Sequence, residues 1–177
     1  MKTAFISSAL SAALLANEPA WARMHGEIVE FGGTTPEPMS SSPPSSPDTK
    51  VLTPVVHVKN IRFVNHADRL VAERCLGFGV RLRLTSDDGE RLPERITAIF
   101  HHPRVTRPDQ VSATDESYLT KVDGDMAYIG FTFDQAWEMQ PGDWTFAFAW
   151  DGELLASKTF AIAPPTSAGS RCDVPTS

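Results

Sequence analysis

The residues best spaced for chemistry lie near the N-terminus. Cleavage after Ala22 would leave Arg23-Met24-His25 as a new chain end. A free α-amine, two backbone amide nitrogens and the imidazole of a third-position histidine can surround one ion in a square plane, which suits Cu(II) or Ni(II). The second residue must not be proline, and Met24 meets this condition. The sequence therefore predicts a copper site formed by Arg23, Met24 and His25, with an ordinary flexible terminus as the alternative.

The other candidate metal and redox residues favour structural roles. His101 and His102 are neighbours in a predicted strand, so they point to opposite faces and cannot easily share one ion. Cys75 and Cys172 have no CxxC spacing, and in an oxidising compartment they predict one disulfide. Closing so long a loop is worth about 4 to 5 kcal/mol in the chain-entropy model. The alternative is a buried thiol at Cys75 and a loose one at Cys172.

The sequence contains none of the short motifs that mark common catalytic centres. It has no G-x-S-x-G elbow, Walker loop, H-E-x-x-H pair or dinucleotide-binding glycine pattern. We therefore expect a protein that is not an enzyme and has no catalytic residues. Apart from the possible Cu(II) site, we expect no cofactor.

Residues 1–22 have the features of a secretory signal peptide. Lys2 supplies a positive charge, residues 4–16 form a short apolar run, and Ala20-Trp21-Ala22 provides the small residues that a signal peptidase requires. A membrane-spanning helix needs about 20 apolar residues, so we expect no membrane insertion. We predict a mature chain that begins at Arg23 and is periplasmic or secreted. The alternative is that this run forms a buried helix of the mature fold.

Composition narrows the range of partners. The 177 residues are enough for one domain, and the net charge of −6 comes without any basic run. Nucleic-acid-binding domains usually carry a basic patch, so nucleic acid is excluded as the main partner. The remaining expectation is an unknown protein or glycan of the cell envelope.

The order of compositional segments gives a domain layout. Residues 33–50 contain five prolines and five serines, which predicts an extended or disordered connector. The full expectation is a signal peptide (1–22), a first strand region (23–32), this connector (33–50), a β-domain (51–163) and a C-terminal tail (164–177).

Apolar residues in the β-domain alternate with polar ones at a period of two. The alternation is clear in residues 78–84 and 96–100, and we expect the second run to stop at His101-His102-Pro103 and a loop to cover Val105–Glu116. Asp123-Gly124 and Asp151-Gly152 indicate two hairpin turns. These features predict an all-β fold, an antiparallel β-sandwich of about seven or eight strands.

Four large aromatic residues share one face of a later predicted strand: Trp144, Phe146, Phe148 and Trp150. We expect all four to fill the core, because together they would form too large an exposed apolar patch. Trp137 precedes this strand and is a candidate platform for a sugar or peptide. A carbohydrate-binding module that uses Trp137 is therefore a second alternative to the copper-binding protein.

The segment from Phe133 to Phe146, with its Trp137-Glu138 and Pro141-Gly-Asp-Trp-Thr-Phe146 motifs, resembles an uncharacterised family of small exported bacterial proteins, domain of unknown function 3859. Glu27–Gly32 and Gly77-Phe78-Gly79 are also similar to family positions. The resemblance implies an immunoglobulin-like sandwich and no known activity. Our main expectation is therefore an exported, non-catalytic binding or structural module of the cell envelope.

Overall fold

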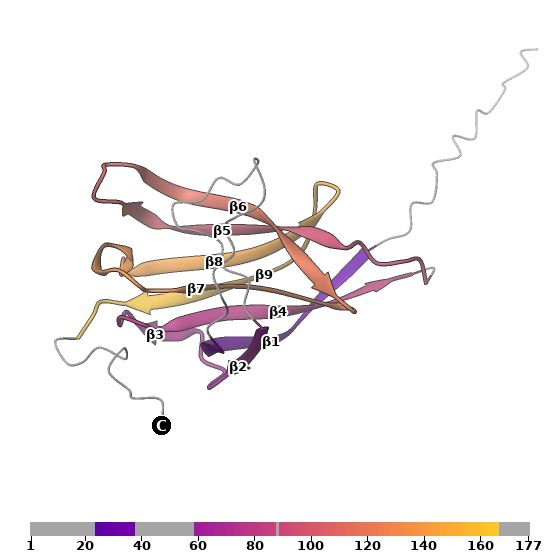
Figure 1. The fold of residues 1–177 in the computed structure, drawn as a ribbon, viewed down its shortest axis with the longest axis horizontal. Coiled ribbons are helices and arrows are strands. Elements are labelled where there is room, and N and C mark those ends of the chain that lie inside the picture. The colour runs from indigo at the N-terminus through magenta and orange to yellow at the C-terminus, as the bar shows by residue number, and fades with distance from the viewer. Residues whose placement is uncertain (1–23, 38–58, 88, 167–177) are drawn as a thin grey trace, which may run out of the picture.

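The computed structural model describes residues 24–37, 59–87 and 89–166, and most of them lie in strands (Figure 1). The elements, in chain order, are β1 (Met24–Glu37), β2 (Lys59–Phe63), β3 (Arg69–Val71), β4 (Gly77–Ser86), β5 (Arg95–Thr106), β6 (Ser112–Asp123), β7 (Met126–Thr132), the 3-10 turn η1 (Ala136–Glu138), β8 (Gly142–Trp150) and β9 (Glu153–Ala163). Among these residues no helix is long and apolar enough to cross a membrane.

The strands form two layers that are joined at one hairpin. The hydrogen-bonded order is β2-β1-β4-β7-β6-β5-β8-β9-β3. β6 and β7 pair only where Val122 and Asp123 face Ala127 and Met126, so the order turns over there and brings two sheets face to face. All pairs are antiparallel except β3 with β9, which is parallel. The predicted all-β sandwich is confirmed, with nine strands in the described part of the chain.

The predicted alternation in β4 decides which of its side chains enter the core. Phe78, Val80 and Leu82 have no exposed surface. The ring of Phe78 reaches across the sandwich to Trp144 and Phe146 on β8, at centroid distances of 5.9 and 5.5 Å. Burial of side chains this large is worth about 1.5 to 3 kcal/mol each, so this contact between sheets is a main source of stability.

The predicted aromatic face of β8 is correct for three residues and wrong for the fourth. Trp144, Phe146 and Phe148 have no exposed surface, whereas Trp150 is 39% exposed. Trp150 is the last residue of β8 and precedes the turn at Asp151 and Gly152, where both φ angles are positive. At the end of the strand it has fewer neighbours to cover it.

Two strands are longer than the sequence predicted. β1 continues to Glu37, because Gly33 and Thr34 pair with β4, and Thr35 and Glu37 pair with Arg62 and Lys59 of β2. The connector predicted from Gly33 therefore does not begin before residue 38, and its remainder lies outside the described residues. β5 passes the expected stop at Pro103 through an irregularity between His101 and Val105 and ends at Thr106. The loop predicted for Val105–Glu116 is thus wrong, since β6 begins at Ser112.

Three glycines stand in register across the outer face of one sheet. Gly32 on β1 faces Gly79 on β4, which faces Gly130 on β7. The Tyr128 side chain lies over two of them, because its hydroxyl would be only 2.7 Å from a Cβ at Gly79 and closer still to one at Gly130, whereas a Cβ at Gly32 would meet the backbone of Asn65. At Gly79 and Gly130, glycine is required by the close approach of the tyrosine.

Candidate functional site

Trp137, the predicted binding residue, lies on η1 in the loop between β7 and β8. Its ring is partly buried and packs against the edge of the core. The Gln140 side chain donates a hydrogen bond to the Trp137 carbonyl at 3.0 Å, which helps to close the loop. Trp137 therefore packs partly against the core, and the rest of its ring is exposed at one end of the sandwich.

Glu138 holds this loop together from the inside. Its side chain is almost fully buried, and its carboxylate accepts hydrogen bonds from the backbone amides of Asp134 and Gln135, both at 2.7 Å. Burial raises the pKa of Glu138 above its usual range, the two amide donors oppose this shift, and the nearby charges of Asp134 and Glu116 reinforce it. The carboxylate thus ties the backbone that precedes Trp137 to the residue that follows it.

A histidine–carboxylate pair lies in the core next to this loop. His102 Nε2 is 3.1 Å from Glu116 Oε1, and the two side chains are only 1% and 5% exposed. His102 Nδ1 donates to the Pro103 carbonyl at 2.8 Å, so that nitrogen carries a proton. The imidazole also stacks on Trp144, with centroids 5.1 Å apart. These contacts join β5, β6 and β8 around one polar centre.

The arrangement has the composition of a general-base pair and lacks access to a substrate. A histidine oriented by a carboxylate can accept a proton only if the reacting group comes within hydrogen-bond distance. Here both ring nitrogens of His102 already face protein oxygens, and the pair is sealed between the sheets. The pair therefore orients and stabilises the core.

His101 and His102 point to opposite faces, as predicted. His101 is exposed and hydrogen-bonds through Nδ1 to Asp115 on β6. Sequence reasoning missed the role of Glu116, although a signal was present. Glu116 alternates in phase with Tyr118 and Thr120, so it shares their inward-facing side of β6.

The structure places two of the three predicted copper ligands in a strand. Met24 and His25 pair with Ser86 and Thr85 of β4, and Arg23 lies outside the described residues. His25 Nε2 is 2.7 Å from Asp87 Oδ1, which leaves Nδ1 for another partner. A square-planar site needs both backbone amides of Met24 and His25, so copper binding would compete with this end of the β1–β4 pairing.

Cys75 lies in the turn before β4, where φ is 62°. Its amide donates to the Phe133 carbonyl at 2.8 Å. Nearby, the amide of Ala72 donates to the carbonyl of Ala163, the last residue of β9, at 3.0 Å. The chain therefore leaves β9 beside the turn that carries Cys75. Cys172 lies outside the described residues, so the disulfide stays a prediction.

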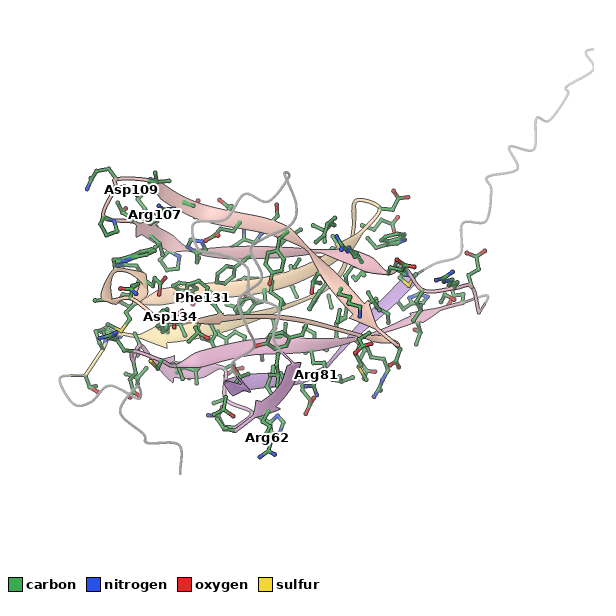
Figure 2. All side chains as sticks on the ribbon, in the orientation of Figure 1. Arg62, Arg81, Arg107, Asp109, Phe131 and Asp134 are labelled. Carbon is green, nitrogen blue, oxygen red and sulfur yellow. The ribbon has the colours of Figure 1, made fainter. Side chains whose placement is uncertain are left out.

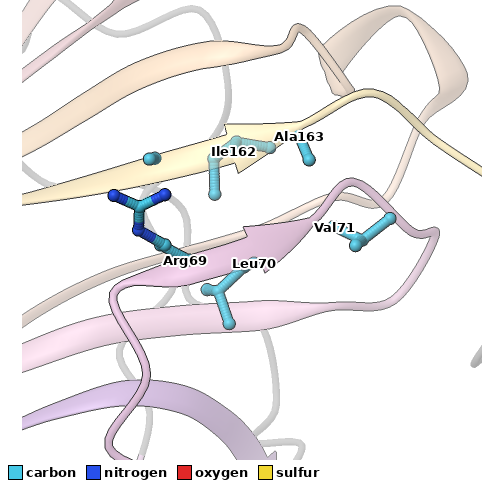
Figure 3. A pocket seen from close by; sticks show the side chains of 6 residues that line it. Arg69, Leu70, Val71, Ile162 and Ala163 are labelled. Carbon is cyan, nitrogen blue, oxygen red and sulfur yellow. The ribbon is translucent and has the colours of Figure 1, made fainter.

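A shallow groove of about 280 Å³ follows the parallel pairing of β3 and β9 (Figure 3). Its lining residues are Arg69, Leu70, Val71, Ala161, Ile162 and Ala163. None of the predicted binding or metal residues lines it. It offers one charged group, Arg69, on an otherwise apolar surface.

Comparisons with known proteins identify the fold and the family. No curated protein matches the chain. Among solved structures, an immunoglobulin-like protein from Pseudomonas aeruginosa is similar with a TM-score of 0.57 and 19% identity, over 81% of this chain and 98% of that one. The predicted immunoglobulin-like sandwich is thus confirmed. The model of the family described as Domain of unknown function (DUF3859) matches residues 43–162, so the chain belongs to this family, as its motifs indicated.

Proposed function

We propose that this protein is an exported, non-catalytic binding or structural module of the cell envelope, with a protein or glycan as its partner. The observation that carries the proposal is the closed interior. The side chains best suited to acid–base work, His102, Glu116 and Glu138, are all buried and hydrogen-bonded within the sandwich. They stabilise loops and strands and do not line an open cleft. An immunoglobulin-like fold in a family without assigned activity fits such a module.

Export rests on the signal-peptide features of residues 1–22 and is compatible with the position of β1. β1 begins at Met24, one residue after the predicted mature N-terminus at Arg23. Cleavage after Ala22 would therefore leave the first strand intact. The intact mass of the protein recovered from outside the cytoplasm tests this, and a mass that includes residues 1–22 would contradict it.

The loop end that carries η1 is the best-supported contact surface. Asp134 on this loop and the turn with Arg107 and Asp109 lie at the same end of the sandwich (Figure 2). Trp137 contributes part of an aromatic ring there, and an aromatic face suits both sugars and peptides.

Capture of partners from envelope extract by the mature protein, with chemical cross-linking, tests the proposal. Because Trp137 also packs on the core, the informative variant is Ala136→Arg, which adds a bulky charge at an exposed neighbour. Trp150→Ala, at the exposed hairpin end, is the control. We expect one partner that wild type and Trp150→Ala retain and Ala136→Arg loses. Equal capture by all three proteins would contradict a binding role for this loop.

Copper binding is a second candidate, favoured by one observation. The Asp87 carboxylate holds His25 through Nε2, and metal-binding histidines commonly use such a partner on the nitrogen that does not face the metal. The cost is the loss of strand pairing at Met24 and His25.

A further inference from the structure

The outer face of β6, β5, β8 and β9 has two adjacent rows of uncharged side chains. The strand registers align Leu119, Thr97, Ala149 and Leu154 in the first row. They align Ser117, Ile99, Ala147 and Ser157 in the second. We call these eight residues the uncharged face. Ala147 and Ala149 at its centre are buried, so a partner would mainly contact the larger side chains around them.

The corresponding surface of the other sheet is different. There Glu30 faces Arg81 and Glu27 faces Arg83 across β1 and β4, and both pairs form salt bridges. A charged, ion-paired surface is typical of a sheet face in contact with water. The uncharged face therefore departs from the pattern that the same molecule uses elsewhere.

The uncharged face is also where large apolar side chains meet solvent. Leu119 and Leu154 occupy its two ends in the first row and are 44% and 65% exposed. The exposed Trp150 lies on the same hairpin as Leu154. The central region of protein interfaces is depleted in charge and rich in such contacts.

Charges of opposite sign border the two rows. Lys121 and Arg95 face each other in the row before Leu119 and Thr97. Asp115 and His101 face each other in the row after Ser117 and Ile99. A two-fold axis that crosses the strands between the two uncharged rows would place the Lys121–Arg95 end of one copy over the Asp115 end of a second. The same rotation places Arg95 over His101, so the attraction between the copies comes from Lys121 and Asp115.

We propose that the uncharged face binds a second copy of this chain in an isologous, face-to-face dimer. The two uncharged rows and the bordering row at each end span six residues along four strands about 4.8 Å apart, which gives a flat area of roughly 400 Å². A standard interface buries about 800 Å² per partner, so the dimer belongs at the weak, concentration-dependent end of the range.

Sedimentation equilibrium of the mature protein across the micromolar range tests the proposal, with Thr97→Glu and Thr85→Glu as matched variants. Thr97 lies in the first uncharged row, whereas Thr85 is exposed on β4 of the other sheet. We expect wild type and Thr85→Glu to dimerise alike. Thr97→Glu should raise the dissociation constant at least about tenfold, because each dimer would bury two unpaired carboxylates. Thermal unfolding confirms that each variant folds.

Charge reversal tests the direction of the axis. Lys121→Asp and Asp115→Lys should each weaken the dimer, and the double variant should restore it. A monomer at every concentration would overturn the proposal, as would a dimer that Thr97→Glu leaves intact. A monomer whose uncharged face instead captures an envelope protein would overturn the second copy as occupant. Failure of the double variant to recover would overturn the axis.

Discussion

Alkaline pH should unfold this protein through its two tyrosines, Tyr118 and Tyr128, the only ones in the chain. Burial raises the pKa of Tyr128 to about 12, while its hydrogen bond with Thr34 and the nearby Arg81 charge partly oppose the shift. Burial raises the pKa of Tyr118 further, and the charges of Tyr128 and Glu116 add to the effect. Ionising either phenol in the native sandwich is therefore unfavourable.

The sign of the effect follows from where each phenol ionises more easily. In the unfolded chain a tyrosine has a pKa of about 10, so the native state resists ionisation and the unfolded state does not. Stability is fully present below pH 10 and is lost as pH rises from there through 12. For Tyr128 the shift of about two units corresponds to about 3 kcal/mol, a large part of the 5 to 15 kcal/mol typical of a domain.

Tyrosinate absorbance, followed against pH together with far-ultraviolet circular dichroism, measures this directly. We expect little tyrosinate at pH 10 in the native protein and ordinary titration in urea. At higher pH the tyrosinate signal should rise together with the loss of β-sheet signal. Tyr128→Phe should halve the final absorbance change. Titration of either tyrosine near pH 10 with the sheet intact would refute the reasoning.

Three further predictions concern packing, metal and disulfide. Phe146→Ala should cost about 3 to 5 kcal/mol in urea unfolding, because Phe146 is fully buried, whereas Leu154→Ala at an exposed site should change stability little. An unchanged midpoint for Phe146→Ala would place that ring outside the core. His25→Ala should abolish binding of one Cu(II) by the mature protein in a spectroscopic titration, and an unchanged titration would remove that site. Free-thiol counting under denaturing conditions should find none, and alkylation of both Cys75 and Cys172 would refute the bridge.

The sequence predicts local structure well because alternation is a local signal. Side chains two residues apart on a strand share a face, so the buried side of β4 and three aromatic residues of β8 follow directly from residue order. The hairpin at Gly124 is equally local, since glycine there adopts a positive φ of 63°. None of these features depends on which strands become neighbours.

Features that depend on strand neighbours were not predictable in the same way. The extent of β1 rests on pairing with β4 and β2, which come later in the chain, and a proline-rich stretch hides that pairing. Burial of Glu138 and Glu116 also contradicts the usual preference of carboxylates for solvent. Burial of a carboxylate becomes favourable only where hydrogen-bond partners are already in place: two backbone amides for Glu138 and a histidine for Glu116. Amino-acid composition does not reveal these partners.

The motif Pro141-Gly142-Asp143-Trp144 also depends on such a neighbour. Gly142 has φ of +133°, and a Cβ there would lie 2.8 Å from the ring of Pro103, at the irregular part of β5. The Pro103 carbonyl accepts a hydrogen bond from His102 Nδ1, and His102 stacks on Trp144. The Trp144 indole in turn donates to the Gln140 carbonyl at 2.9 Å. Glycine at position 142 thus allows β8 to start against Pro103, which orients the buried His102. The segment from Pro141 to Trp144 and the His102–Glu116 pair therefore form one packed unit.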